Sequence, residues 1–159
     1  MTQDATFEEG GEAPLRLRAD DADDLAVLST LVQDAVFPGN EMTWRRNQRQ
    51  FALLLNRFRW EDLPAAEQRA RPYERVQSVL VIEDVLGVSS QGVERGDKNT
   101  ILSLLSVSFE PGEEGSGRVV LTLAGDGAVA VDVEVLDVTL EDVTRPYVAP
   151  SKSAPHHPE

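Results

Sequence analysis

Several residue types that carry chemistry are scarce in this 159-residue chain, which has no cysteine, two histidines and two lysines. Without cysteine the chain has no disulfide, thiolate nucleophile or sulfur-ligated metal centre. Both histidines, His156 and His157, stand at the C-terminal end, which excludes a Ser-His-Asp site or a histidine-bound metal from the folded core. Lys98 lies in a glycine-rich polar stretch and Lys152 near the C-terminus, where a solvated amine stays protonated and unsuited to Schiff-base chemistry.

Motifs for phosphate, calcium and membranes are also missing. The chain has no G-x-x-x-x-G-K-[ST] loop and no G-x-G-x-x-G fingerprint, and Gly125-Asp126-Gly127 lacks the alternating acids of a calcium-binding loop. No apolar run approaches the ~20 residues that span a bilayer, and the N-terminal segment has neither a basic start nor an apolar stretch. We therefore expect a soluble cytoplasmic protein with no cofactor, no bound metal and no membrane contact.

Acidic residues outnumber basic residues by 28 to 15, which gives a formal net charge of −13. A field of that sign repels phosphate, so nucleic acid is not an expected partner. The contents of hydrophobic residues (41 %) and charged residues (27 %) are those of an ordinary globular domain. The length suits a single domain, which we place at residues 14–148. We expect disordered tails at residues 1–13 and 149–159, because both ends have too few large apolar residues to form a core.

A group of aspartates precedes the clearest helical pattern, in which leucines recur every three residues. The aspartates are Asp20, Asp21, Asp23 and Asp24. Acidic side chains at a helix start accept hydrogen bonds from free backbone amides and suit the positive end of the helix dipole. The pattern predicts a helix over residues 21–33. A metal cluster is an alternative use of the same aspartates, which we favour less because capping already accounts for them.

Most of the remaining chain alternates between apolar and polar residues, as half-buried strands do. The strand-like segments are residues 15–18, 36–37, 42–44, 50–60, 75–86, 100–109, 118–124 and 128–135. Between them we expect a helical turn beginning at Pro64, at most a short strand near residues 92–94, and a hairpin turn at residues 125–127. Leucine spacing leaves a helical interpretation open for half of residues 100–109.

The last strand contains a change in its apolar alternation. Alternate residues from Val129 to Val135 are apolar, and the apolar positions then move by one residue, from Leu136 to Leu140. Because side chains alternate between the two faces of a strand, this shift requires a bulge or a sharp bend between Val135 and Leu136. Together the patterns predict an α+β fold, a mostly antiparallel curved β-sheet or partial barrel with one main α-helix. A pleckstrin-homology-like or split-barrel arrangement is the analogy we draw.

Arginine is concentrated in residues 44–75, which hold eight arginines, four acids and both tryptophans. The segment carries a net charge of +4 and the rest of the chain carries −17. Arginine and tryptophan are the residues that most often anchor interfaces. The segment therefore predicts a recognition surface for an acidic protein partner or a small anionic ligand. Its candidate binding residues are Trp44, Asn56, Arg57, Arg59, Trp60 and Arg75.

Arg57 and Arg59 are the sharpest candidates, since they lie two residues apart on the strand face opposite Phe58 and Trp60. We expect both guanidinium groups to be exposed. Replacing both arginines by alanine is then expected to weaken partner binding with little loss of stability. The alternative is that the arginines are ion-paired inside the protein and that the tryptophans fill the core.

Paired carboxylates keep an enzymatic alternative open, because glycoside hydrolysis or a hard-metal site needs only Asp and Glu. In a chain with 28 acids such pairs are expected by coincidence. We therefore favour a non-catalytic binding or adaptor module, monomeric or homodimeric, over a small enzyme or an enzyme's accessory subunit, and we assign no catalytic residue. The pairs concerned are Glu83 with Asp84, Asp132 with Glu134, and Asp137 with Glu141.

Several segments of the chain resemble the corresponding segments of a known family. They are residues 31–36 (LVQDAV), 51–61 (FALLLNRFRWE), 101–105 (ILSLL) and 109–112 (FEPG), together with the final strand. With these segments the chain resembles an uncharacterised family of single-domain bacterial proteins, mostly alphaproteobacterial, that is classed as a domain of unknown function. The resemblance covers nearly the whole ordered chain. It implies a cytosolic bacterial protein and assigns no activity, cofactor or catalytic residue.

Overall fold

The structure is a computed structural model that describes residues 14–70, 72–93 and 98–148. Its strands are β1 (Arg16–Ala19), β2 (Val36–Pro38), β3 (Met42–Arg45), β4 (Gln50–Phe58), β5 (Glu74–Ile82), β6 (Val85–Gln91), β7 (Ile101–Pro111), β8 (Gly117–Leu123), β9 (Ala128–Val133), β10 (Val138–Asp142) and β11 (Tyr147–Val148). Its helices are α2 (Ala22–Leu31) and α3 (Leu63–Gln68), and its 3-10 turns are η2 (Gly39–Glu41), η3 (Arg46–Gln48) and η4 (Trp60–Asp62). The tails predicted at residues 1–13 and 149–159 lie outside the described residues.

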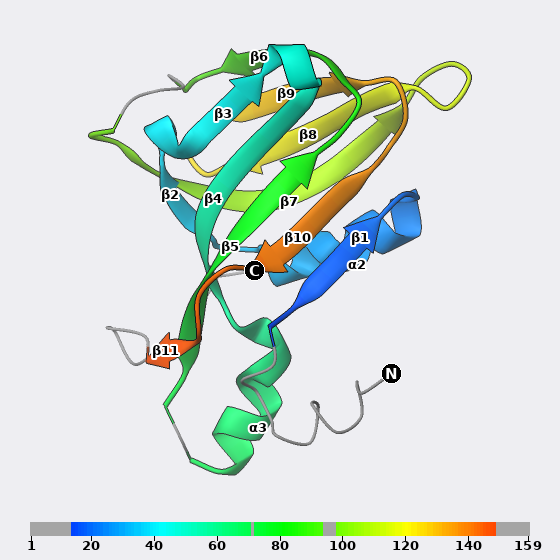
Figure 1. The fold of residues 1–159 in the computed structure, drawn as a ribbon. Coiled ribbons are helices and arrows are strands. Elements are labelled where there is room, and N and C mark those ends of the chain that lie inside the picture. Colours follow the sequence, from blue (N-terminus) through cyan, green and yellow to red (C-terminus); the bar gives the residue numbers. More distant parts are fainter. Residues whose placement is uncertain (1–13, 71, 94–97, 149–159) are drawn as a thin grey trace.

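The strands form one curled sheet in which the described pairings are antiparallel (Figure 1). Their order is β1-β10-β5-β4-β2-β7-β8-β9-β6, with β3 paired to β4 and β11 paired to β5. β2 joins the two halves of the curl, because it pairs with β4 and with β7. The predicted curved antiparallel sheet is confirmed. The expectation of one main helix is corrected, since α3 is a second short helix with a proline in its first turn.

The predicted helix at residues 21–33 is confirmed as α2, which ends two residues earlier than expected. The side chain of Asp21 caps it by accepting a hydrogen bond from the backbone amide of Asp24 at 2.8 Å. α2 buries Leu25 and Leu28 and packs against β1 and β7. It therefore contributes one apolar stripe to a core that otherwise lies inside the curled sheet.

The predicted bend between Val135 and Leu136 is confirmed, and it does more than change the face of one strand. β9 ends at Val133 within the half of the sheet formed by β6 to β9, whereas β10 pairs with β1 and β5 in the other half. At the bend Val135 is 47 % exposed, and the next residue, Leu136, is 4 % exposed. The change in alternation thus marks the point where the chain crosses between the two halves of the sheet.

Residues 75–86 do not form the single strand that the sequence predicts. β5 ends at Ile82, a turn follows in which Asp84 adopts a left-handed conformation (φ 56°), and β6 begins at Val85. Because apolar residues flank this turn on both sides, the sequence concealed it. The sequence did not predict β6 as a separate strand, although six of its seven residues have register partners in β9; residues 92–93, where at most a short strand is expected, are not in a strand, and residue 94 lies outside the described residues.

For residues 100–109 the strand interpretation is the right one, because β7 pairs with β8 along most of its length. Among the residues that the structure describes, no helix has both the length and the apolar content needed to cross a bilayer.

Candidate functional site

The interior face of β4 changes from apolar to charged near the end of the strand. Leu53 and Leu55 point into the core, and Arg57 follows at the same alternation with a fully buried side chain (0 % exposed). Two polar residues, Ser78 of β5 and Asp142 of β10, lie buried beside it and are register partners of each other. One end of the core is therefore closed by a polar group.

Hydrogen bonds surround the guanidinium group of Arg57. Its Nη2 lies 3.0 Å from Oδ1 and 3.1 Å from Oδ2 of Asp142, and its Nε donates to Ser78 Oγ at 3.0 Å. Nη1 and Nη2 also donate to the two carboxylate oxygens of Glu61, each at 2.9 Å. The Ser78 hydroxyl and the Leu15 amide donate to Asp142 at 2.7 and 2.9 Å. The buried charge is thus matched by two carboxylates in charge-assisted hydrogen bonds.

The ionisation of Arg57 and Glu61 is coupled through this contact. Burial opposes the charged form of Arg57, but hydrogen bonds and attraction from Glu61 and Asp142 outweigh burial and raise the pKa of Arg57. Burial likewise acts to raise the pKa of Glu61, and its hydrogen bonds from Arg57 reverse the shift, so that the pKa lies below its ordinary value of 4.5. Both groups are therefore stabilised in their charged forms.

Arg59, only 4 % exposed, is surrounded by three carboxylates. It donates to Glu74 through Nη1, its Nε lies 3.6 Å from Glu61 Oε2, and its Nη1 lies 3.6 Å from Asp62 Oδ2. We refer to both arginines, Ser78 and the four acids around them as the buried arginine cluster. Two guanidinium groups against four carboxylates give it a net charge of −2. Its members are Arg57, Arg59, Glu61, Asp62, Glu74, Ser78 and Asp142.

The predicted exposure of Arg57 and Arg59 is therefore wrong. The sequence held the contrary signal, because Arg57 shares its alternation with Leu53 and Leu55, and Asp142 shares its alternation with the apolar residues of β10. The double alanine variant is now expected to lose much of its stability, since each alanine leaves carboxylates without their cation.

Asn56 and Arg75 are brought together on the opposite face of the same strands. Arg75 Nε donates to Asn56 Oδ1 at 2.5 Å, and Arg75 Nη2 donates to the Asn56 backbone carbonyl at 3.0 Å. The Asn56 amide donates in turn to the hydroxyl of Tyr147 in β11, a residue that sequence analysis missed because β11 is only two residues long. Burial lowers the pKa of Arg75, and attraction from Tyr147 and Asp34 offsets part of that effect. The polar groups of Asn56, Arg75 and Tyr147 are therefore largely occupied by hydrogen bonds to one another.

Both tryptophans are anchored rather than freely exposed. Trp60 donates its indole N–H to the Gln33 carbonyl at 3.0 Å, and its ring meets Phe58 edge-on with centroids 4.8 Å apart. Trp44 is partly buried against the core and is the register partner of Phe51. Trp44 thus fixes β3 immediately before the turn that leads into β4.

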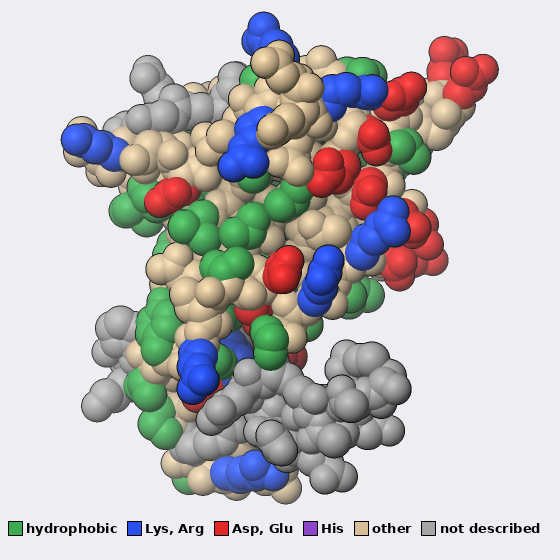
Figure 2. Space-filling model, viewed as in Figure 1, with side chains coloured by type: hydrophobic (Ala, Val, Ile, Leu, Met, Phe, Trp, Pro, Cys, Tyr) green, Lys and Arg blue, Asp and Glu red, His purple; other side chains and the backbone are tan. Residues whose placement is uncertain are grey.

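That turn carries two of the exposed arginines of the segment. Arg45, Arg46, Asn47 and Gln48 line a surface hollow of about 340 Å³. The side chain of Arg45 reaches only the Gln50 amide oxygen, at 3.5 Å, and the side chain of Arg46 has no hydrogen-bond or ion-pair partner within the described parts of the chain. Figure 2 shows basic side chains over this turn at the top of the molecule, where Figure 1 places the start of β4. We call these four residues the β3–β4 arginine turn.

The next arginine along the chain differs from its two neighbours. Arg49 adopts a left-handed conformation (φ 53°) that ends η3, and its Nη2 lies 2.5 Å from the carboxylate of Glu134. The two arginines of the turn therefore face solvent without a carboxylate partner among the described residues, whereas Arg49, which follows the turn, is ion-paired. Residue spacing alone could not have grouped the side chains of this turn, because the hollow that they line depends on the path of η3.

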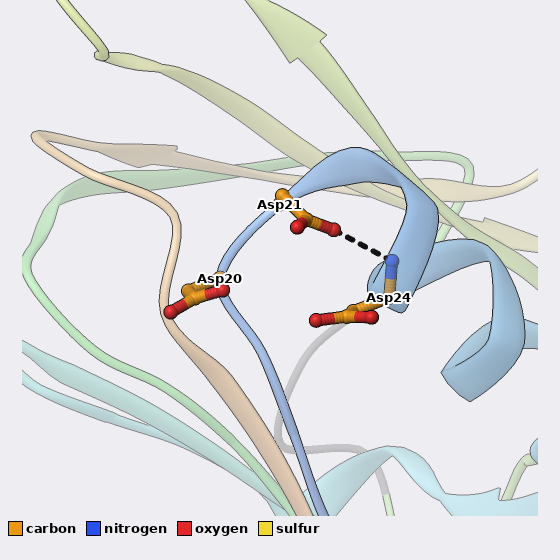
Figure 3. A group of neighbouring side chains, drawn as sticks. All are labelled: Asp20, Asp21 and Asp24. Carbon is orange, nitrogen blue, oxygen red and sulfur yellow. Dashed lines mark hydrogen bonds between the residues drawn. The ribbon is translucent and has the colours of Figure 1, made fainter.

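The aspartates before α2 do lie close together, as Figure 3 shows. The carboxylates of Asp20, Asp21 and Asp24 each offer an oxygen within 4.8 Å of the others, and all three residues are exposed. These are the described residues that could hold a hard metal ion. Asp21 already serves as the helix cap, so the cluster has a structural explanation without a ligand.

The paired carboxylates that kept an enzymatic alternative open are mostly engaged with basic or amide groups. Asp132 accepts from Arg118 at 2.9 Å, Asp137 from Arg18 at 3.0 Å, and Glu83 from the amide of Gln50 at 3.0 Å. These contacts lie on the surface, where such pairs stabilise weakly. They have the character of a solvated polar face.

Comparison with known proteins gives a family and no activity. No protein with a curated description matches the chain, and no solved structure matches it. A family model described as "Protein of unknown function (DUF2948)" matches residues 15–157, from β1 to beyond β11. The match agrees with the resemblance noted in the sequence, and the chain belongs to this family of proteins of unknown function.

Proposed function

We propose that the protein is a non-catalytic binding module that recognises an acidic partner protein or a small anionic ligand through the β3–β4 arginine turn. The observation that carries the proposal is that Arg45 and Arg46 are exposed beside a hollow and have no carboxylate partner among the described residues. We therefore propose the start of β4 as the recognition surface and not its end, where Arg57 and Arg59 are neutralised.

The chemistry of the turn suits a carboxylate or phosphate group. An exposed guanidinium presents a fixed fork of N–H donors that can pair with two oxygens at once. Asn47 and Gln48 add amide groups at the rim of the same hollow. Because Trp44 holds the preceding strand against the core, the turn loses little freedom when a ligand binds.

The charge of the rest of the protein sharpens this selectivity. A small positive site on a chain with net charge −13 attracts an anion locally, whereas a long polyanion meets repulsion over the remaining surface. The proposal therefore favours short acidic segments and small anions, and it includes a bacterial cytoplasmic location, as the family resemblance implies.

The test is a titration of the full chain with a short oligoglutamate peptide and, separately, with inorganic phosphate, followed by backbone amide NMR shifts. We expect saturable shifts at residues 45–48 with at least one probe, and weaker binding as salt is added. Arg45→Gln combined with Arg46→Gln should reduce the affinity by about tenfold or more, since each lost charged hydrogen bond is worth about 1.5–3 kcal/mol.

The matched control is Arg69→Gln combined with Arg145→Gln, which removes the same charge from two exposed positions away from the turn. This control should retain the affinity of the unmodified chain. Equal losses in both double variants, or shifts that avoid residues 45–48 with both probes, would contradict the proposal, because binding would then follow net charge or another surface.

A further inference from the structure

Acidic residues stand close to the β3–β4 arginine turn, although its two arginines have no carboxylate partner in the part of the chain that the structure describes. Glu83 and Asp84 form the turn between β5 and β6, and the amide that follows them, at Val85, donates to the carbonyl of Arg49. An arginine side chain readily pairs with a carboxylate that it can reach. A feature of the structure must therefore keep Arg45 apart from Glu83.

Gln50 lies between the two. It is the first residue of β4 and the register partner of Arg45 in β3. The next residue, Phe51, is paired with Ile82 of β5, so antiparallel register places Gln50 beside Glu83. Buried residues alternate along β4 from Phe51, and Gln50 therefore points to the outer face. The three polar side chains form a row across the strand ends, with the amide in the middle.

The side-chain amide of Gln50 is hydrogen-bonded to both of its neighbours. Its Nε2 donates to Glu83 Oε2 at 3.0 Å, and its Oε1 accepts from Arg45 Nη1 at 3.5 Å. A carboxylate only accepts hydrogen bonds and a guanidinium only donates them, so the two neighbours together fix which way the amide faces. The group that holds Arg45 is consequently a neutral oxygen.

The neighbouring Arg49 shows the outcome where a carboxylate is in direct contact. Its Nη2 lies 2.5 Å from Glu134 Oε1, and hydrogen bonding to this carboxylate raises the pKa of Arg49. A ligand could bind Arg49 only by displacing Glu134. Arg45 is held by an amide instead, so no ion pair has to be broken before it binds an anion.

We propose that Gln50 is a positioning residue of the arginine turn, which orients the Arg45 guanidinium beside the hollow and leaves its charge available to an anionic ligand. This inference rests on the proposed function and adds the residue that keeps one of its arginines from being neutralised. An amide oxygen orients a guanidinium without cancelling its charge, whereas a carboxylate at the same place would compete with the ligand. Orienting the group in advance lowers the cost of binding.

Exchanging the two partners of this hydrogen bond tests the role of Gln50 without changing composition or net charge. In Gln50→Glu combined with Glu83→Gln, a carboxylate meets Arg45, and the hydrogen bond between positions 50 and 83 can still form with its direction reversed. We expect this exchange variant to bind oligoglutamate or inorganic phosphate about threefold to fivefold more weakly than the unmodified chain, because an exposed ion pair now competes with the ligand. Its thermal midpoint should not fall, since no core contact is lost.

The matched control is Glu67→Gln combined with Gln68→Glu, which exchanges the same residue types at exposed positions of α3, at the other end of β4 (Figure 1). This control should bind like the unmodified chain. Glu83→Gln alone should weaken binding less than the exchange does, because Arg45 then gains no carboxylate and, as a donor, still faces the amide oxygen.

An exchange variant that binds as tightly as the unmodified chain overturns the role of Gln50 and leaves the proposed function standing. The same holds if Glu83→Gln alone loses as much affinity as the exchange, because the carboxylate placed at position 50 then has no effect of its own. An unmodified chain that binds neither probe overturns the proposed function and the role of Gln50 with it.

Discussion

The arginines at the two ends of β4 lie in opposite environments, one exposed and one buried. At its start, Arg45 and Arg46 face solvent beside a hollow, whereas at its end Arg57 and Arg59 are buried among four carboxylates. The residue type is the same, and only about ten residues separate the groups. The difference lies in where the side chains point. Those of η3 are exposed, whereas the side chain of Arg57, at the end of β4, points into the core.

A buried guanidinium needs its charge matched, since an unmatched ion in the interior costs several kcal/mol, and carboxylates match Arg59 even though its Nε has no hydrogen-bond partner. An exposed guanidinium is solvated and can exchange water for a ligand at little cost. The comparison therefore assigns Arg57 and Arg59 to stability, and it leaves Arg45 and Arg46 free for recognition.

Arg57→Met should cost about 3–5 kcal/mol of unfolding free energy, because it removes one partner of a buried ion pair and leaves Asp142 and Glu61 uncompensated. Urea unfolding followed by circular dichroism measures the change. Arg46→Met is the matched control at the other end of β4 and should leave the urea midpoint unchanged. Equal urea midpoints for the two variants would contradict the assignment of Arg57, and not Arg46, to the stability of the fold.

Glu61→Gln should cost about 1.5–3 kcal/mol at neutral pH, because its two charge-assisted hydrogen bonds with Arg57 are weakened. The pKa of Glu61 is lowered in the folded protein, so it binds a proton less readily there than in the unfolded chain. Its contribution to stability is therefore present above its ordinary value of 4.5 and is lost as the pH falls through the lower folded value. Unfolding midpoints measured from pH 7 downward should fall less steeply in the variant, and parallel curves would contradict this assignment.

Asn56→Ala tests the intermediate case of Arg75, which is half-buried and held by an amide. Removing the Asn56 side chain takes away the acceptor of Arg75 Nε and should cost about 1–2 kcal/mol. Tyr147→Phe removes only the neighbouring hydroxyl and serves as the milder comparison. A loss as large as that of Arg57→Met would place Arg75 with the buried arginines instead.

Arg45→Gln combined with Arg46→Gln should have the smallest effect on folding, with a thermal midpoint unchanged within error, because neither side chain has a carboxylate partner in the described structure. The same variant should lose anion binding. A clear fall in the midpoint would show that the turn supports the fold and would weaken its assignment to recognition.

Local periodicity predicted much of this fold. The capped helix at Asp21, the antiparallel strands and the bend after Val135 each follow from spacing within about a dozen residues. The break at Asp84 escaped detection because apolar residues flank Glu83 and Asp84 on both sides. These features depend on the sequence immediately around them.

The burial of Arg57 depends on residues far along the chain. Asp142, its main buried partner, is separated from it by 85 positions, so no local pattern brings the two together. The alternation shared by Arg57 and Leu55 was the only nearby signal of an inward side chain. The hollow at the arginine turn was equally hidden, since it depends on how η3 departs from β3.

The short crossing from β9 to β10 has a mechanical consequence. Four residues, Glu134 to Asp137, tie a strand of one half of the sheet to a strand of the other, and buried residues of both halves belong to one hydrophobic core. The two halves should consequently melt in a single transition and exchange their most protected amide hydrogens at a common rate. With so short a crossing at Val135, we expect the whole sheet to unfold as one cooperative unit.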